Sequence, residues 1–315
     1  MTTFFRNLLY LLRIRRVEFR IAEIPILAIP ILLLAEDGSF LRSGRFWEGV
    51  FVFFFLFAFG DMINCYADRD LDAVYKPHLS EAVYGLGLGF VKFQIAVSAI
   101  MALVLSIDLS WSMNRWTIAG ATVIGLILGA AYSVEPIRLK GRGVAQLLCL
   151  WAIIFVGPIF FVSQLLTATI SLRLIVFAAF YGTAQMGIIL INTAEDYPED
   201  LAANVRTSVV SLGLQNGISV AFWMIVFGTI GTLSSLYIFY LGTNSTSKTL
   251  ASLAPAFAAS LFVALEGSLL KQRVDKVDLG EAITIVKRAA KRVPLWVTCF
   301  AWSVMWSTAF VFWHR

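Results

Sequence analysis

The chain is poor in charged residues and in cysteine for its length, and each shortage excludes a class of protein. Only 14% of its 315 residues are Asp, Glu, Lys or Arg, whereas a soluble chain carries about 25%. Three cysteines, Cys65, Cys149 and Cys299, lie in or beside apolar segments without metal-ligand spacing. They therefore form neither a disulfide framework nor a thiolate metal centre. The net charge of +5 is interpreted as a topology signal, and no nucleic-acid partner is predicted.

Apolar residues are abundant, at 59% of the chain, and they occur in blocks of membrane-spanning length. A hydrocarbon core of roughly 30 Å requires about 20 such residues in a helix. We therefore predict an all-α integral membrane protein that crosses the lipid bilayer many times, as one domain over residues 1–315. Nine transmembrane helices are predicted, at 21–34, 46–66, 83–107, 116–134, 144–166, 172–194, 218–241, 250–270 and 294–313.

Lys and Arg residues are unevenly distributed between the predicted loops. If residues 1–20 lie inside, most of the loop cations fall on the inner side. The positive-inside rule then predicts a cytoplasmic N-terminus. Residues 1–20 lead into an apolar run without an evident cleavage site, so this start is interpreted as an anchor. The basic, partly amphipathic segment 271–293 is predicted to be cytoplasmic and interfacial.

Two apolar runs end in the same pattern, N-x-x-x-D-x-x-x-D, on the predicted cytoplasmic side. The first copy holds Asn64, Asp68 and Asp72, and the second holds Asn192, Asp196 and Asp200. On a helix, positions i, i+4 and i+8 share one face, so each copy is predicted to align an amide with two carboxylates. Oxygen donors of this kind suit Mg²⁺, which often bridges to substrate phosphates. The alternative is a solvated helix end with ordinary acids.

Basic side chains near the motifs are candidates for holding phosphate oxygens. They are Lys76, Arg138, Lys140, Arg142 and Arg206. Positive-inside anchoring is the alternative for segment 138–142. Three acids lie off the i, i+4 stripe and are interpreted as charge balance for nearby cations: Asp70, Glu195 and Glu199.

The sequence after each motif also repeats. A basic residue, a short polar turn and a Leu-Gly pair follow both copies, ending at Gly87 and Gly213. This order predicts two pseudo-repeated halves. An apolar pocket is predicted beneath the motifs, although a phenylalanine is also ordinary lipid-facing filler. Its candidate lining residues are Tyr132, Gln185, Tyr181 and Phe59.

With these motifs the chain resembles the UbiA superfamily of intramembrane prenyltransferases over nearly its whole length. The resemblance rests on both acidic motifs and on Tyr132-Ser133 followed by Lys140. It implies nine helices in two halves around a central cavity, with catalytic aspartates that bind a pair of Mg²⁺ ions. It also implies ionisation of an isoprenoid diphosphate and transfer of the prenyl group to an acceptor, aromatic or lipid-like, in the membrane.

Two departures from the family pattern keep a terpene cyclase as the alternative. Cys65 stands where many members carry Asp, and Lys76-Pro77-His78 stands where many carry an Arg-Pro segment. In a cyclase the substrate's own double bond would capture the cation without an acceptor.

A cation-coupled transporter is the third alternative. The acidic residues of this chain gather at one membrane face, whereas transporter sites lie near the midplane of the membrane.

Overall fold

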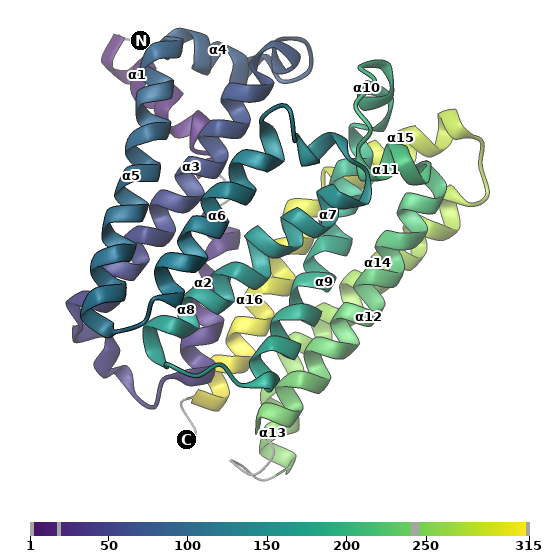
Figure 1. The fold of residues 1–315 in the computed structure, drawn as a ribbon. Helices are drawn as coiled ribbons and strands as arrows, with labels where there is room; N and C mark the ends of the chain where they lie inside the picture. Colours follow the sequence, from purple (N-terminus) through teal and green to yellow (C-terminus); the bar gives the residue numbers. More distant parts are fainter. Residues whose placement is uncertain (1–2, 18–19, 241–245, 313–315) are drawn as a thin grey trace. The chain divides into compact units, whose positions relative to one another are not determined.

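The computed structural model describes residues 3–17, 20–240 and 246–312, and nearly all of them are helical (Figure 1). Within these residues there is no β-strand, so the predicted all-α fold is confirmed. The chain forms two compact units. Unit 1 consists of Met1–Ile21, Glu36–Leu139 and Gln164–Ala168, and unit 2 consists of Ala22–Ala35, Lys140–Ser163 and Thr169–Arg315.

Unit 1 is built around one long helix that packs against three others. Its helices are α1 (Thr3–Ile14), α3 (Gly44–Tyr75), α4 (Pro77–Leu86), α5 (Leu88–Met113) and α6 (Thr117–Ser133). The 32-residue α3 contacts α4, α5 and α6. At the end of α3 that carries the acidic motif, Met62 and Cys65 pack with Tyr10, Leu79 and Val91 in one apolar cluster.

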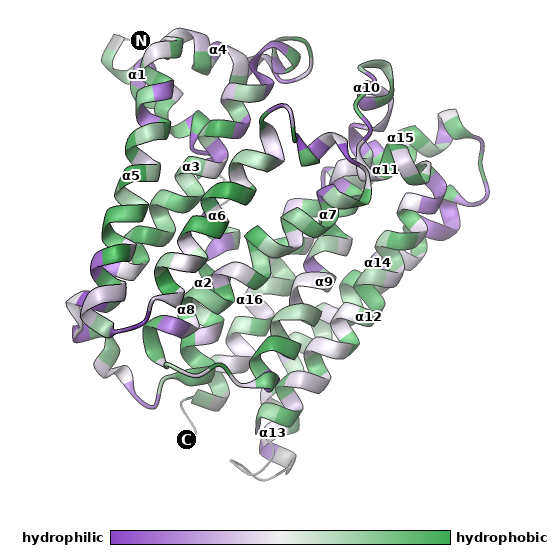
Figure 2. Ribbon diagram, in the orientation of Figure 1, coloured by the Kyte–Doolittle hydropathy of each residue, from purple (hydrophilic) through white to green (hydrophobic). Residues whose placement is uncertain are grey.

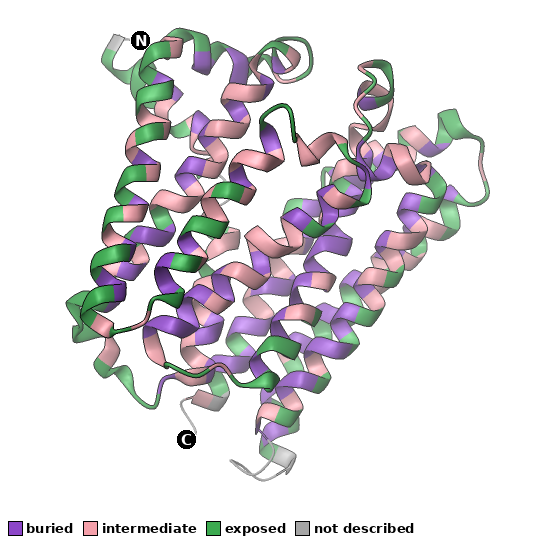
Figure 3. Ribbon diagram, in the orientation of Figure 1, coloured by how far each residue is buried: buried purple, intermediate pink, exposed green. Residues whose placement is uncertain are grey.

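Unit 2 holds the larger apolar core, with α9 at its centre. Its helices are α2 (Arg20–Leu34), α7 (Val144–Leu150), most of α8 (Gly157–Leu166), α9 (Leu172–Glu195), α10 (Tyr197–Ala202), α11 (Ser208–Leu212), α12 (Leu214–Tyr240), α13 (Thr246–Ser252), α14 (Ala254–Val274), α15 (Leu279–Ala290) and α16 (Val293–Phe312). Two-thirds of the apolar window of α9, 67%, is buried, against 22% for α5 (Figure 3). Lipid-facing surface therefore belongs mainly to the other helices.

Glycines allow α9 and α12 to pack closely. A Cβ at Gly228 would lie 2.2 Å from the backbone nitrogen of Ala184, and one at Gly187 would lie 2.7 Å from the carbonyl oxygen of Ala221. Small residues of this kind are how helices pack in lipid, where no hydrophobic effect drives association. This contact fixes α9, the helix at whose end the second acidic motif begins.

Among the described residues, seven helical segments are long and apolar enough to cross a membrane: Gly44–Tyr75, Leu88–Met113, Val144–Leu166, Leu172–Glu195, Leu214–Tyr240, Ala254–Val274 and Val293–Phe310. Their central portions are apolar, with hydrophilic residues towards the helix ends (Figure 2). The predicted span at 116–134 appears as the shorter apolar helix α6. The predicted first span appears as α2, which has 15 residues and two internal prolines. Multi-pass membrane architecture is thus supported, and the count of nine spans stays a prediction.

Two predicted boundaries were wrong, at 83–107 and at 271–293, and one span with the predicted bounds, 144–166, has a local irregularity. The predicted span 83–107 is divided at Gly87, whose φ of 87° ends α4 before α5 begins. The span 144–166 contains a π-helical turn at Trp151–Val156. The predicted cytoplasmic segment 271–293 begins inside α14, and only α15 forms the amphipathic helix. Hydropathy averages over such local breaks, because they leave the apolar composition unchanged.

The two halves share the predicted order of elements. In unit 1, α3 is followed by Lys76, α4, Gly87 and α5; in unit 2, α9 and α10 are followed by Arg206, α11, Gly213 and α12. Both glycines adopt positive φ, 87° and 79°, where L side chains are strained. This shared conformation confirms that the Leu-Gly pairs are equivalent breaks.

The predicted N-terminal segment forms α1, which packs against α4. The hydroxyl of Tyr10 donates a hydrogen bond to Glu81 Oε1 at 2.6 Å, and this bond raises the pKa of Tyr10. Gly85 lies under the same ring, where a Cβ would meet Tyr10 at 2.4 Å. The helix that follows the first motif is therefore fixed from outside by α1.

Candidate diphosphate and metal site

The first acidic motif lies on one face of a continuous helix, as predicted. Helix α3 runs without a break through Asn64, Asp68 and Asp72 as far as Tyr75. Asp68 and Asp72 are buried, at 3% and 9% exposure, and Asn64 is half-buried. Buried carboxylates are costly unless they are paired or bind a cation. This pair is therefore the strongest candidate for metal binding in unit 1.

Residues at and after the end of α6 complete the surroundings of this stripe. Ser133 Oγ donates to Asn64 Oδ1 at 3.2 Å, and Arg138 Nη2 lies 3.3 Å from Asp68 Oδ1. Arg138 also reaches Glu135 at 3.4 Å, while its buried Nε hydrogen has no partner among the described residues. The predicted phosphate ligand Arg138 thus lies directly beside a motif carboxylate. Sequence reasoning did not identify the Ser133 contact.

The second motif does not lie on one helix, which corrects the prediction. Helix α9 ends at Glu195, Asp196 lies at the junction, and α10 begins at Tyr197. Pro198 has no N–H to donate to the Ala194 carbonyl, and that carbonyl accepts from Asp196 N–H instead. The proline, which lies between the two aspartates in the sequence, is the signal that should have predicted the break.

The break changes the exposure of the second motif. Asn192 is exposed on α9, Asp196 is half-buried, and Asp200 on α10 is buried at 8% exposure. One helical bond survives across the junction, from Asp200 N–H to the Asp196 carbonyl at 2.8 Å. The two aspartates are therefore still one turn apart, whereas Asn192 belongs to a separate helix.

Helix α15 supports the second motif through an ion pair that the sequence did not predict. Lys287 Nζ donates to Glu199 Oε1 at 2.6 Å. The other carboxylate oxygen of Glu199 is buried and has no partner among the described residues. Glu199 thus balances a cation distant in sequence, whereas Asp70 pairs with its neighbour Arg69 at 3.3 Å, as predicted.

In unit 2 the backbone brings two predicted phosphate-binding segments together. Gly143 N–H donates to the Arg206 carbonyl at 2.8 Å, and Ser208 N–H donates to Gln146 Oε1 at 2.8 Å. Arg206 is exposed and Lys140 is half-buried. Their loops are therefore neighbours, and both cations belong to the unit that carries the second motif. Lys76 lies at the junction between α3 and α4, where its N–H donates to the Asp72 carbonyl.

The donor chemistry of both motifs fits Mg²⁺. Each provides two carboxylates and one amide, all oxygen donors, at a helix end. No group of three or more His, Cys, Asp or Glu side chains that could hold a metal occurs among the described residues. Mg²⁺ commonly takes only one or two carboxylates and completes its shell with water and substrate phosphate. A carboxylate pair in each unit is sufficient for that mode.

Two predicted pocket residues belong to the packed core of unit 2. Tyr181 is fully buried and stacks between Phe177 and Phe300, with ring centroids 5.7 and 5.9 Å away. Gln185 Nε2 donates to the Tyr181 hydroxyl at 3.1 Å, and Gln185 Oε1 has no partner among the described residues. Within unit 2 these residues pack against one another and line no described cavity.

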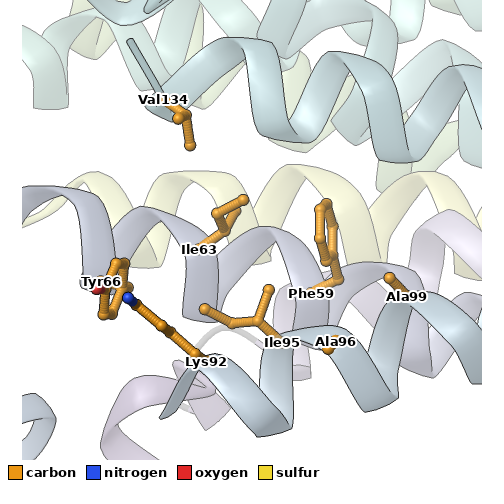
Figure 4. Close-up of a pocket in the computed structure, with 8 residues that line it drawn as sticks. All are labelled: Phe59, Ile63, Tyr66, Lys92, Ile95, Ala96, Ala99 and Val134. Carbon is orange, nitrogen blue, oxygen red and sulfur yellow. The ribbon is translucent and has the colours of Figure 1, made fainter. Parts of the chain in front are cut away.

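Phe59 lines a cavity of about 270 Å³ in unit 1, as shown in Figure 4. Its other lining residues are Ile63, Tyr66, Lys92, Ile95, Ala96, Ala99 and Val134. Phe59, Ile63 and Tyr66 lie roughly half a turn around α3 from the acidic stripe, at 100° per residue. This cavity therefore lies on the other side of α3 from the carboxylates. Tyr132 is half-buried beside Ser133 and does not line it.

The fold and its acidic helix ends define a multi-pass α-helical membrane protein with oxygen donors for a divalent cation. The sequence model of the UbiA prenyltransferase family matches residues 24–278. That range covers most of the chain, and the protein therefore belongs to the UbiA prenyltransferase family.

Characterised relatives match parts of the chain. Homogentisate phytyltransferase of Synechocystis sp. is 24% identical over 60% of this chain and 63% of its own length. The bacteriochlorophyll synthase 33 kDa chain of Cereibacter sphaeroides is 31% identical over 48% of each chain. The 2-carboxy-1,4-naphthoquinone phytyltransferase of Synechocystis sp. is 26% identical over 66% and 67%. The matched region thus spans between about half and two-thirds of these relatives.

Solved structures share the fold. A UbiA homologue from Archaeoglobus fulgidus bound to DMAPP and Mg²⁺ covers 94% of this chain and 98% of its own, with a TM-score of 0.64 and 15% identity. A digeranylgeranylglyceryl phosphate synthase structure covers 96% and 98%, with a TM-score of 0.66 and 16% identity. At such low identity the likeness establishes the fold.

Proposed function

We propose that this protein ionises an isoprenoid diphosphate with Mg²⁺ and transfers the prenyl group to an acceptor, aromatic or lipid-like, within the membrane. The observation that carries the proposal is the α3 stripe, where buried Asp68 and Asp72 share a face and Arg138 lies 3.3 Å from Asp68. A paired carboxylate with an adjacent guanidinium suits a metal-bound diphosphate, whose oxygens need both kinds of partner.

The carboxylates and cations of the chain have distinct roles in this proposal. Asp68, Asp72, Asp196 and Asp200 would hold Mg²⁺, with Asn64 and Asn192 as further oxygen donors. When bound, Mg²⁺ withdraws charge from the diphosphate and so stabilises it as a leaving group. Arg138, Lys76, Lys140 and Arg206 donate to phosphate oxygens that the metal leaves free. The Arg138 Nε hydrogen, which lacks a partner among the described residues, is one such donor.

The bonding changes balance without an oxidant or reductant. The C1–O bond of the prenyl diphosphate breaks, and its electron pair leaves with pyrophosphate. A nucleophilic atom of the acceptor forms a new bond to C1 and loses its proton, which the released pyrophosphate or water takes up. The residues that position pyrophosphate stabilise its developing negative charge, which is the largest electrostatic change of the reaction.

Transfer to an aromatic acceptor is favoured over cyclisation by two observations. The relatives named above include a homogentisate phytyltransferase and a naphthoquinone phytyltransferase. Cys65, whose presence kept the cyclase alternative open, is buried in the unit 1 core with Met62 and Leu79. This departure from the family pattern leaves the donors of the motif, Asn64, Asp68 and Asp72, in place.

The proposed site belongs at the cytoplasmic side, with the N-terminus. The support is the excess of Lys and Arg in the segments that share a side with the two motifs. Cysteine-accessibility labelling of Glu81→Cys and Glu36→Cys in sealed vesicles tests this orientation. We expect opposite labelling for these two positions, with Glu81→Cys protected from an external reagent in right-side-out vesicles.

The reaction is tested with purified protein, Mg²⁺ and prenyl diphosphates of several lengths, each with and without an aromatic acceptor such as homogentisate. We expect pyrophosphate release and a prenylated product that both require the acceptor. Chelation of Mg²⁺ should stop release, and re-addition should restore it. A cyclic hydrocarbon formed without acceptor would establish the cyclase instead. Ion flux in liposomes without diphosphate turnover would contradict both enzymes.

A further inference from the structure

A second cavity, which unlike the first is lined by several charged residues, lies in the hairpin formed by α14 and α15 in unit 2. It has a volume of about 160 Å³ and is lined by Glu266, Leu269, Leu270, Arg273, Ile285, Arg288, Ala289 and Arg292. Figure 2 shows hydrophilic residues gathered at the end of α14 and in the loop that follows it. None of the residues assigned to the diphosphate site lines this cavity.

The cavity carries an excess of positive charge. Three arginines face one carboxylate, because Glu266 is the only acid among the lining residues. Arg292 Nη1 lies 3.2 Å from Glu266, and its guanidinium also lies 5.7 Å above the ring of Trp296, which is 1% exposed. One arginine is thus held in place. Arg273 and Arg288 are exposed and make no ion pair among the described residues.

An exposed apolar stripe leads along α14 to the cavity. Phe257, Leu261, Leu265 and Leu269 are 59%, 50%, 54% and 47% exposed, and each is four residues from the next. Arg273 is the next position of the same series, one turn beyond Leu269 and about 40° further around the helix at 100° per residue. The stripe lies on Ala254–Val274, a helix apolar enough to span a membrane. Apolar surface that ends in a cluster of guanidinium groups matches the layout of a phospholipid.

We propose that this cavity binds the phosphate headgroup of an anionic phospholipid, whose acyl chain lies along the stripe on α14. Guanidinium groups bind phosphate oxygens through paired, charge-assisted hydrogen bonds. Basic pockets beside membrane helices are suited to anionic headgroups. A zwitterionic lipid brings its own cation, which the arginines repel. The apolar stripe on α14 favours a lipid over free phosphate, because free phosphate has no acyl chain to pack against the stripe.

The site also bears on the second motif. Helix α15 contributes Arg288 to the cavity and Lys287 to the ion pair with Glu199. A headgroup bound between α14 and α15 therefore holds the same helix that supports Glu199. Lipid binding is expected to stabilise this hairpin whatever reaction the protein performs.

The probe is a phosphatidylglycerol with a fluorescent acyl chain, bound to the purified full chain in detergent. Arg273→Gln/Arg288→Gln removes two lining cations. The matched control is Lys276→Gln/Lys291→Gln, which removes the same charge from exposed positions of the same hairpin outside the cavity. Size-exclusion profiles and thermal midpoints verify that both variants fold. Competition with unlabelled phosphatidylglycerol, phosphatidylcholine and inorganic phosphate identifies the ligand.

We expect the arginine variant to weaken binding by about tenfold or more. The lysine variant should stay within about twofold of wild type at physiological ionic strength, since salt screens exposed charges that lie outside the cavity. Phosphatidylglycerol should displace the probe, and phosphatidylcholine should not. Equal losses in both variants would overturn the proposal in favour of general charge attraction. Displacement by inorganic phosphate at the same concentration as by phosphatidylglycerol would overturn the lipid assignment.

Discussion

The two acidic motifs share a spacing but differ in structure. The first lies on an unbroken helix, and its carboxylates are buried beside an arginine that follows α6. The second is divided by Pro198, and its last carboxylate lies on the six-residue α10, which α15 supports through Lys287. A continuous helix sets the spacing of the first pair. The second pair depends on a short helix and on a distant ion pair.

The two motifs agree in the types of their side chains more closely than in their geometry. Both motifs keep two aspartates one turn apart, because Asp200 N–H still bonds to the Asp196 carbonyl. The amide residue is different: Asn64 is on the same helix as its aspartates and accepts from Ser133, whereas Asn192 is exposed on the preceding helix. Asn192 is therefore the weaker of the two predicted amide ligands.

The largest expected effect comes from removing one motif carboxylate at a time. Each of four variants should reduce pyrophosphate release at saturating substrate by at least about 100-fold, or ~2.7 kcal/mol. The variants are Asp68→Asn, Asp72→Asn, Asp196→Asn and Asp200→Asn. Each keeps the shape of the side chain and removes a metal-binding charge. Steady-state release assays measure the loss.

The control for these variants is Asp70→Asn, which removes an exposed acid adjacent to the stripe that pairs with Arg69. Its activity should stay within about threefold of wild type, roughly 0.7 kcal/mol. Near-normal release from both second-motif variants would break the comparison and leave the first motif as the metal site alone.

The next largest effect tests what the two halves share. Gly87→Ala and Gly213→Ala should each destabilise the protein by about 2 kcal/mol, since both positions adopt positive φ, a region that costs an L residue roughly 1–3 kcal/mol. Neither position has an atom within 4 Å of the added Cβ, so the cost is conformational and should be equal.

Unfolding in mixed detergent measures these free energies, with Gly89→Ala as the control. Gly89 also has open space around it, but it lies in the first turn of α5 with ordinary backbone angles. Alanine there should be neutral or stabilising by a few tenths of a kcal/mol. A large loss at one of Gly87 and Gly213 and none at the other would contradict their equivalence.

Much of this architecture could be predicted because it depends on composition and spacing. Hydropathy located the helices, and the i, i+4, i+8 spacing predicted the stripe of Asp68 and Asp72. What the sequence did not predict depends on backbone detail or on distant partners. Gly87 and Pro198 break helices within patterns that remain periodic, and the Lys287–Glu199 pair joins residues 88 apart. Tyr181 is an aromatic residue in an apolar span, which made it a pocket candidate, but in the structure it packs in the core of unit 2.

The third effect tests the break itself. Pro198→Ala restores an N–H that can donate to the Ala194 carbonyl, so we expect α9 to extend through Asp196 and displace Asp200. Activity should fall by about tenfold, or ~1.4 kcal/mol, with a higher Mg²⁺ requirement. Activity measured over a Mg²⁺ titration distinguishes this from simple loss of folding, which would lower activity at every Mg²⁺ concentration.

The matched control for this change is Pro77→Ala. Pro77 lies at the start of α4, after the first motif and not between its carboxylates. Its replacement should therefore leave the Mg²⁺ dependence of activity unchanged. A shift of equal size in both variants would mean that the proline between the second pair of aspartates has no special role.

The smallest effect tests the outside support of the second motif. Lys287→Gln should reduce thermal stability by about 1 kcal/mol or less, because the pair with Glu199 is partly exposed, at 41% and 27%, and solvent screens it. Glu199→Gln in the same background should recover part of that loss, since it removes the carboxylate left without its cation. A double-mutant cycle of midpoints in detergent measures the coupling. Lys291→Gln, at the residue that follows the end of α15, serves as the control for lost charge. If Lys287 and Glu199 are coupled but the Mg²⁺ requirement of activity is unchanged, the ion pair only stabilises the protein. If the Mg²⁺ requirement rises in Lys287→Gln, α15 positions the second pair of aspartates. The first pair needs no such ion pair for its spacing, because both aspartates lie on α3.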